Sequence, residues 1–394
     1  MHGNTSQSPN LRAYRAKTIW TMQPDMDPIE DGLIVTRDNT IQDIGHYRHL
    51  KIHLGQTPVT ELESKIVIPG LINAHTHLEL SHLHGRPIMG AGFETWVKSL
   101  IYLPLKGIDK KTLDRAVTEI IDSGSICIGD ISGHKPLTIY QTLNSQTLHY
   151  RLFIEFLGFK KPLTDKPKWP KKIRPNQDHI ISAAGHALYS THPHTLQVLK
   201  SWTTLNKRPF SIHLSEHPGE VELLTTGRGE FTELMKHLVL PENFIPPGIS
   251  PVAYADQLGI LDKGTLAVHC VQTNDNDIEI LKKRCVFVCL CPRSNAFIGV
   301  GRAPWEKFKE NDLQICLCTD GLCSNVDLNL WNEARYMLSQ WKNSITLYQV
   351  IKWMTTNPAQ ALGFFDMFGT LETGKSAYFT SIPENIIDEF GLKD

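Results

Sequence analysis

The sequence predicts an α/β fold in which a (β/α)8 TIM-type barrel carries a small composite β-sandwich built from both chain ends. From Val67 onward, short strand-like runs alternate eight times with helical stretches, over a length that suits such a barrel. Both ends of the chain instead show short strands separated by turns. No GxGxxG motif follows the first strand of the alternating region, which argues against a doubly wound sheet.

We therefore expect two domains in the 394 residues, with the β-sandwich formed by residues 1–66 and 364–394 and the barrel by residues 67–363. A hydrophobic content of 41% allows a sizeable buried core. The strand candidates of the barrel are 66–74, 125–132, 150–157, 179–185, 209–214, 265–270, 285–291 and 314–319. The helical candidates include 111–123, 135–145, 193–205, 218–238, 274–284, 303–311, 328–341 and 346–362.

Composition bounds the partners and the compartment. A formal net charge of −1 gives no bias toward nucleic acid or acidic membranes, and no apolar run reaches the length of a membrane helix. The first residues lack the apolar region of a signal peptide, so we expect a cytoplasmic protein. The eight cysteines form no CxxC motif and are expected to be reduced thiols. We expect a small-molecule substrate; the oligomeric state stays open, with a homodimer as one option.

Two histidines end the first strand candidate of the barrel. In VIPGLINAHTHLELSH an apolar run leads to His75 and His77, which are separated by one residue. Side chains in a strand alternate between faces, so these two imidazoles project the same way. Because unpaired histidines are costly on a buried face, the pair indicates a site for one metal ion.

A matching set of polar residues follows later strands. His213 and Glu216 follow the fifth strand candidate, His269 ends the sixth, and Asp320 follows the eighth. The carboxyl ends of barrel strands ring one mouth, so three imidazoles and the Asp320 carboxylate can hold a divalent ion with one position open. Such an ion lowers the pKa of a bound water to about 7.

The other roles at this mouth are less determined by the residues alone. Glu216 could shuttle a proton or instead act as a charge at a helix N-terminus. His269 could ligate the metal, hydrogen-bond the water, or be a structural residue. Asp320 could accept the water's proton while it ligates the metal. The basic, proline-rich residues 160–174 are most simply a solvated loop, with contact to an anionic substrate as the alternative.

The combination of PGLINAHTH, HLSE, HC and TDGLCSN resembles the amidohydrolase superfamily, in its branch of deaminases and chlorohydrolases. The resemblance covers essentially the whole chain and implies a metal-dependent barrel with a composite sandwich. It implies catalytic roles for Glu216, His269 and Asp320, and metal ligands at His75, His77, His213 and Asp320. Binuclear members carry a carboxylated lysine on the fourth strand. The corresponding HIISAAGHA has no lysine, so one ion is expected: zinc first, with iron or manganese as alternatives.

Substrate contacts follow from the same resemblance. His186 matches a fourth-strand histidine that contacts substrate in adenosine-type deaminases. Loop segments after strands one, five and seven look like those of aminodeoxyfutalosine deaminases from the alternative menaquinone pathway, with methylthioadenosine/S-adenosylhomocysteine deaminases as the competing subfamily. Arg293 and Arg302 could hold a substrate carboxylate or brace loops. Trp96 and Phe93 could cover a base or belong to the core.

Two positions depart from the family pattern. Gly321 stands where a serine is usual, which removes a hydroxyl near the site, and Tyr378 stands where an aspartate is common. We expect the first to affect substrate contacts and the second only packing.

The resulting functional hypothesis is a metal-dependent aminohydrolase that releases ammonia from a 6-aminopurine nucleoside-like compound such as aminodeoxyfutalosine. Hydrolysis at another ring (guanine, cytosine or a chlorotriazine) is the first alternative. A barrel that has lost catalysis is the second, and the complete ligand set argues against it.

Overall fold

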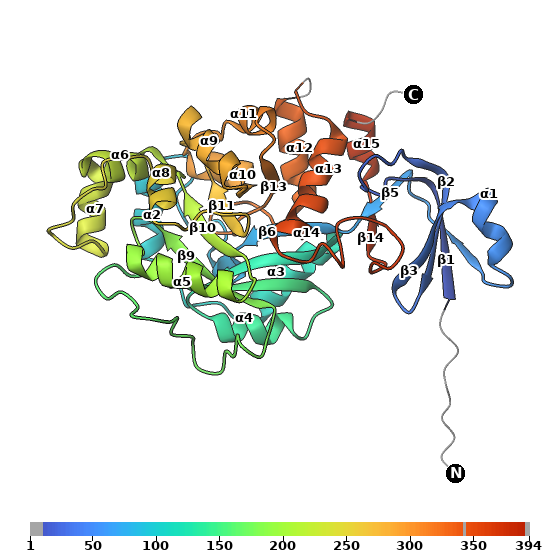
Figure 1. Ribbon diagram of the computed structural model, residues 1–394, viewed down its shortest axis with the longest axis horizontal. Helices are drawn as coiled ribbons and strands as arrows, with labels where there is room; N and C mark the ends of the chain where they lie inside the picture. Colours follow the sequence, from blue (N-terminus) through green and yellow to red (C-terminus); the bar gives the residue numbers. More distant parts are fainter. Residues whose placement is uncertain (1–10, 342–343, 391–394) are drawn as a thin grey trace, which may run out of the picture.

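The computed structural model describes residues 11–341 and 344–390. It contains an eight-stranded parallel sheet surrounded by helices and a separate six-stranded sheet, which lies beside it in Figure 1. The predicted α/β class, with a (β/α)8 TIM-type barrel and a separate unit from the chain ends, is confirmed.

Seven of the eight barrel strands begin and end within two residues of the predicted bounds, whereas the first begins at Leu71 rather than at residue 66. The eight strands follow chain order in the sheet and pair only in parallel: β6 (Leu71–Thr76), β7 (Ser125–Ser132), β8 (His149–Phe156), β9 (Ile181–Ala187), β10 (Phe210–Leu214), β11 (Thr265–His269), β12 (Phe287–Leu290) and β13 (Gln314–Leu317). Most of their residues are buried, as expected for strands covered on both faces.

The first and last barrel strands meet through a few specific bonds. Among the described residues no β-ladder joins β13 to β6. Instead, the Asn73 side-chain amide donates to Thr319 Oγ1 at 2.6 Å, and Asn73 Oδ1 accepts from the Thr319 amide at 3.3 Å. The Asp320 amide donates to the His75 carbonyl at 3.2 Å. These bonds place the ends of β6 and β13 next to each other.

Helices cover the outside of the barrel. After β6 come the 3-10 helix η2 (Leu78–Leu83), α2 (Phe93–Ile101) and α3 (Lys110–Asp122). The others are α4 (Pro136–Leu143), α5 (Pro193–Leu205), α6 (Pro218–Thr226), α7 (Glu230–Leu238), α8 (Pro251–Gln257), α9 (Asp275–Lys283), α10 (Pro292–Ile298), α11 (Trp305–Glu310), α12 (Leu330–Gln340), α13 (Leu347–Met354) and α14 (Thr356–Ala361). Residues 157–180 contain no helix, in agreement with the expected loop.

Two predicted helices are each divided into two. The stretch 218–238 breaks between α6 and α7, where Gly227 and Gly229 have φ of 66° and 94°, a conformation that ends helices. The stretch 346–362 breaks at Thr355, whose φ of −132° and ψ of −79° are not helical.

The two chain ends form one connected sheet. Its strands are β1 (Leu11–Ile19), β2 (Ile29–Arg37), β3 (Thr40–His46), β4 (Val59–Glu61), β5 (Ile66–Pro69) and β14 (Phe379–Ser381), with α1 (Tyr47–Leu50) and the 3-10 helix η1 (Lys51–His53) after β3. The last helix, α15 (Glu384–Phe390), follows β14. The prediction that both ends contribute to one unit is confirmed.

The strand predicted over 66–74 is two strands in different sheets. β5 pairs with β1 and β14 in the terminal sheet, whereas β6 pairs with β7 in the barrel. Gly70 lies between them, and a Cβ there would come within 2.4 Å of Ile126. The predicted boundary at residue 67 therefore cuts β5, and the division into domains stays a prediction.

Several smaller expectations can be compared with the structure. Seven of the eight cysteines are buried, and Cys285 is exposed; none of the eight forms a disulfide. Tyr378 packs against His149 and Phe368 with ring centroids 5.0 and 5.6 Å apart, which agrees with a packing role. None of the helices in the described ranges combines the length and apolarity needed to cross a membrane.

Candidate active site

The barrel brings the predicted polar residues to one mouth. His75 is the fifth residue of β6, His77 follows that strand, and His213 is the fourth residue of β10. His269 ends β11, while Glu216 and Asp320 follow β10 and β13. All but His77 are buried.

The backbone is in an unusual conformation at these strand ends. Ser215, His269 and Asp320 have φ of 51°, 74° and 60°, the left-handed region that non-glycine residues rarely adopt. Such conformations occur where surrounding structure enforces them, often at functional sites. They turn the chain sharply and leave the polar side chains at the mouth.

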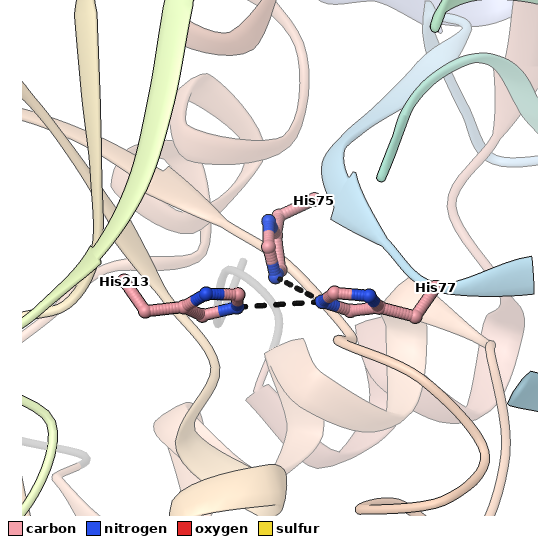
Figure 2. A group of neighbouring side chains, drawn as sticks. All are labelled: His75, His77 and His213. Atoms are coloured by element: carbon pink, nitrogen blue, oxygen red, sulfur yellow. Dashed lines mark hydrogen bonds between the residues drawn. The ribbon is translucent and has the colours of Figure 1, made fainter. Parts of the chain in front are cut away.

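Figure 2 shows three imidazole rings whose nitrogens converge on one point. His77 Nε2 lies 3.1 Å from His75 Nε2 and 3.3 Å from His213 Nε2. Asp320 Oδ1 is 3.5 Å from Nε2 of both His75 and His77. A tetrahedral zinc ion with bonds of about 2.1 Å separates its ligand atoms by roughly 3.4 Å, so these four groups fit one divalent ion.

Hydrogen bonds fix which imidazole nitrogen can bind the ion. His213 Nδ1 lies 2.9 Å from the His186 carbonyl, which can only accept, so Nδ1 carries the proton and Nε2 presents its lone pair. Burial and the neighbouring imidazoles lower the pKa of His213 well below its usual range, and they lower that of His77 to about 3. The low pKa values keep His77 and His213 neutral, so their rings can offer lone pairs to a metal ion.

Two hydroxyls orient the Asp320 carboxylate. Ser294 Oγ and Ser324 Oγ each donate to Asp320 Oδ2 at 2.7 Å, which leaves Oδ1 facing His75 and His77. Burial alone would raise the pKa of Asp320, but its bond to His75 and the charges of His77 and His269 hold it well below the ordinary value. Asp320 is therefore held as an anionic carboxylate beside the imidazoles.

Gly321 has a steric reason to lack a side chain. A Cβ at this position would lie 2.9 Å from the Cβ of His77. The family's usual serine would therefore require His77 to move. The hydroxyls on Asp320 come instead from Ser294 and Ser324.

Glu216 and His269 lie side by side next to the metal ligands. Glu216 Oε1 is 3.5 Å from His269 Nε2, and His269 Nδ1 is 2.9 Å from Asn295 Oδ1. Burial and the charges of Asp320 and Glu220 raise the pKa of Glu216 well above its ordinary value. Burial lowers the pKa of His269 to about 4. Burial thus favours the protonated form of the Glu216 carboxyl group and the neutral form of the His269 imidazole.

One cavity of about 370 Å³ opens above these residues. Glu216, His269, Asp320, His77 and His213 line its floor. His186 also lines it, with Nδ1 2.5 Å from Ser190 Oγ. Trp96 contributes from α2 and donates its indole N–H to the Cys323 carbonyl at 3.1 Å. Phe93 lines the cavity too, but it is buried and stacks on His217 at 3.7 Å, so it also belongs to the core.

The two predicted carboxylate-binding arginines lie elsewhere. Arg293 makes bonds of 2.7 and 2.6 Å to Asp327, and Arg302 makes one of 2.6 Å to Glu306. Neither lines the cavity above the histidines. Both arginines form ion pairs outside this cavity, as the bracing alternative expects, and a contact of either one with substrate stays a prediction.

A second trio also has ligand atoms close together: Glu155, His186 and His213, all within 4.8 Å of one another. It shares His213 with the first set, and the free lone pair of that ring can serve only one ion. The set of His75, His77, His213 and Asp320 has more ligands, so Glu155 and His186 are left to face the cavity.

Sequence reasoning missed two acidic residues of the cavity wall. Glu79 accepts bonds of 2.5 to 3.0 Å from Ser132 Oγ and the amides of residues 133–135. Glu155, near the end of β8, has one buried oxygen without a partner, and burial raises its pKa to about 8. The signal for Glu79 was its place two residues after His77, and for Glu155 its place in the apolar run LFIEF.

Comparison with known proteins identifies the family of this chain. A model of the amidohydrolase family matches residues 66–390. The chain belongs to the amidohydrolase family. It is thus a hydrolase that acts on carbon–nitrogen bonds other than peptide bonds.

The amidohydrolase is similar over most of its length to several characterised proteins. It is 26% identical to the 5′-deoxyadenosine deaminase of Methanosphaera stadtmanae, covering 91% of this chain and 83% of the relative. It is 26% identical to the 5-methylthioadenosine/S-adenosylhomocysteine deaminase of Syntrophobacter fumaroxidans, covering 91% and 81%. The Helicobacter pylori aminofutalosine deaminase, solved with methylthio-coformycin, superposes with a TM-score of 0.80 at 22% identity, covering 95% and 94%.

Proposed function

We propose that this amidohydrolase is a metal-dependent deaminase of a 6-aminopurine nucleoside, which it hydrolyses at C6 with release of ammonia. The observation that best supports this proposal is that three imidazoles and Asp320 converge within the span of one divalent ion, beside Glu216 and His269 on the same cavity floor. The two curated relatives named above act on adenine nucleosides, which supports this choice of ring. Aminodeoxyfutalosine is one candidate within the class.

His75, His77, His213 and Asp320 would hold one divalent ion, with zinc expected from their nitrogen and oxygen donors. When bound, that ion lowers the pKa of a coordinated water to about 7 and so makes a nucleophile available at neutral pH.

The chain's own side chains then handle the protons. Burial favours the protonated form of Glu216, which can donate that proton to the purine nitrogen next to C6 as water adds to that carbon. The Nε2 lone pair of His269, fixed by Asn295, can accept a hydrogen bond from the attacking water and orient it. Asp320 Oδ1 lies where it can take the water's proton and pass it toward the departing amine. His186, whose ring lies 5.1 Å from that of His213, can contact the purine ring.

The direct test measures ammonia release by protein loaded with zinc, iron or manganese. The panel contains adenosine, 5′-deoxyadenosine, 5′-methylthioadenosine, S-adenosylhomocysteine and aminodeoxyfutalosine, with guanine, cytosine and a chlorotriazine as alternatives. We expect turnover of at least one 6-aminopurine nucleoside that a chelator abolishes and metal restores. Turnover of only guanine, cytosine or the triazine, or of nothing, would reject the proposal.

A further inference from the structure

The outer part of the cavity has an apolar wall, which we define by Val97, Leu100, Ile101, Leu157, Leu238 and Val239. Three of these residues belong to α2. Leu238 is the last residue of α7, Val239 follows it, and Leu157 lies in the loop after β8. Leu157 and Leu238 keep 63% and 46% of their surface exposed, so the apolar character continues to the mouth. In Figure 1, α2 and α7 lie at the end of the molecule away from the terminal sheet.

The same cavity offers no positive charge to an anionic substrate group. Within the described ranges, none of its lining residues is a lysine or an arginine. The polar lining consists of imidazoles, hydroxyls and carboxyl groups, and the carboxyl groups include Glu79 and Glu155. A carboxylate placed here would lose its water without gaining a cationic partner.

The orientation of the nucleoside follows from its chemistry. The exocyclic amine at C6 must reach the metal ligands on the cavity floor, and the 5′ carbon of the ribose lies at the opposite end of the molecule. In this orientation the 5′ substituent lies toward the mouth, where the half-exposed Leu157 and Leu238 of the apolar wall are.

We propose that the substrate's 5′ substituent is an apolar group, such as an alkylthio or aryl group, and that the apolar wall selects against an amino-acid tail at this position. The inference rests on the proposed function and narrows its substrate class. Burial of apolar surface favours such a group without any specific bond, whereas a zwitterionic tail loses hydration at the same place.

The test compares kcat/KM for 5′-methylthioadenosine and S-adenosylhomocysteine, measured by ammonia release with the metal-loaded wild-type protein. We expect the methylthio compound to be preferred at least tenfold. An equal or higher value for S-adenosylhomocysteine would overturn the inference while leaving the deaminase function intact. Absence of turnover for every adenine nucleoside would instead reject the function and the inference together.

A pair of variants locates the selection on the wall. Leu238→Arg places a cation at the half-exposed rim, so we expect it to raise kcat/KM for S-adenosylhomocysteine severalfold and to lower it for 5′-methylthioadenosine. Leu238→Gln, which is polar but uncharged, should lower the second value without raising the first. If both variants kept the wild-type ratio of the two values, the wall would not set the preference and the inference would be wrong.

Discussion

His213 has one ring nitrogen committed to a carbonyl, and its other nitrogen, Nε2, is left free to bind a metal ion. The same principle fixes His269, whose Nδ1 faces Asn295 and whose Nε2 faces Glu216. Neighbouring residues thus determine which nitrogen of each imidazole carries the proton and which presents a lone pair, as in metal sites generally.

At the residue scale, Glu216 carries the sharpest prediction. Glu216→Gln keeps the shape of the side chain but removes its exchangeable carboxyl proton. We expect kcat to fall by about 10²–10⁴-fold while the metal content stays at one ion per chain. Glu230→Gln, an exposed residue at the start of α7, serves as the matched control and should retain activity. A Glu216→Gln enzyme with near wild-type kcat would remove Glu216 from the proton transfer.

The hydroxyl bonds to Asp320 lead to a second residue-scale prediction. Ser294→Ala removes one of two donors to Asp320 Oδ2, so the carboxylate is held less firmly. We expect metal affinity to fall about 10–100-fold, measured by competition with a chelator, while saturating metal restores most of kcat. Ser339→Ala, exposed on α12, is the control and should bind metal like the wild type. Unchanged affinity in Ser294→Ala would show that Ser324 alone orients the ligand.

At the scale of elements, α2 is tied to the barrel mouth at three points. The amides of Gly90 and Gly92 donate to the carbonyls of Phe297 and Ile298 at 2.6 and 3.0 Å, and the Trp96 indole donates to Cys323. The helix therefore holds one wall of the cavity at a fixed distance from the loops that follow β12 and β13.

Trp96→Phe tests that attachment. The substitution keeps an aromatic ring in the cavity and removes the N–H donor, a net loss of about 1 kcal/mol. We expect KM to rise about fivefold with little change in kcat, because the wall shifts while the floor is unaffected. Trp202→Phe, on α5 and remote from the cavity, should leave both constants unchanged. A fall in kcat without a change in KM would contradict this role.

The elements that the sequence predicts carry a signal in their own residues, and the elements that it does not predict lack one. All eight barrel strands have continuous apolar runs, and α3 begins with the N-cap Asp109 accepting from Thr112. By contrast, α2 and α7 begin at Gly92 and Gly229, which provide no side-chain cap. The start of α2 thus has no residue-level signal, and the break between α6 and α7 depends on glycine conformation rather than on periodicity.

The same contrast applies to the site. His75, His77, His213, Glu216, His269 and Asp320 follow strands, so topology alone brings them together. Arg293 and Arg302 also come after a barrel strand, β12. The direction in which each side chain points, however, depends on the acidic residue with which it forms an ion pair. Asp327 lies 34 residues from Arg293 in the chain and takes it out of the cavity. Such ion pairs form only in the folded structure, so no spacing in the sequence predicts them.

At the scale of the whole molecule, buried carboxyl groups make stability depend on pH. Burial raises the pKa of Glu220 to about 8 from an ordinary value near 4.5, so the folded protein keeps a proton that the unfolded chain releases. This contribution to stability is fully present below about pH 4.5 and is lost as the pH rises through about 8. The slope from one such group is at most about 1.4 kcal/mol per pH unit.

Glu220→Gln should therefore flatten the pH dependence. The Glu220 oxygen that accepts from the Glu216 amide at 2.8 Å has an equivalent in glutamine, and the other oxygen has no partner to lose. Urea unfolding of the chelator-treated protein between pH 5 and pH 8.5 provides the measurement. We expect the variant to gain stability relative to the wild type as the pH rises. Parallel curves for the two proteins would show that Glu220 is ionised throughout in the folded state.

The way the barrel closes has a consequence for how the protein matures. The strands that meet without a ladder, β6 and β13, are also those that present His75 and His77 on one side and Asp320 on the other. An ion bound by all three residues would link the first and last strands at the junction where backbone hydrogen bonds stabilise the barrel least. Newly made chains that acquire the ion should resist proteolysis along this line sooner than chains that do not. Binding of the metal ion and closure of the barrel would then occur in a single step.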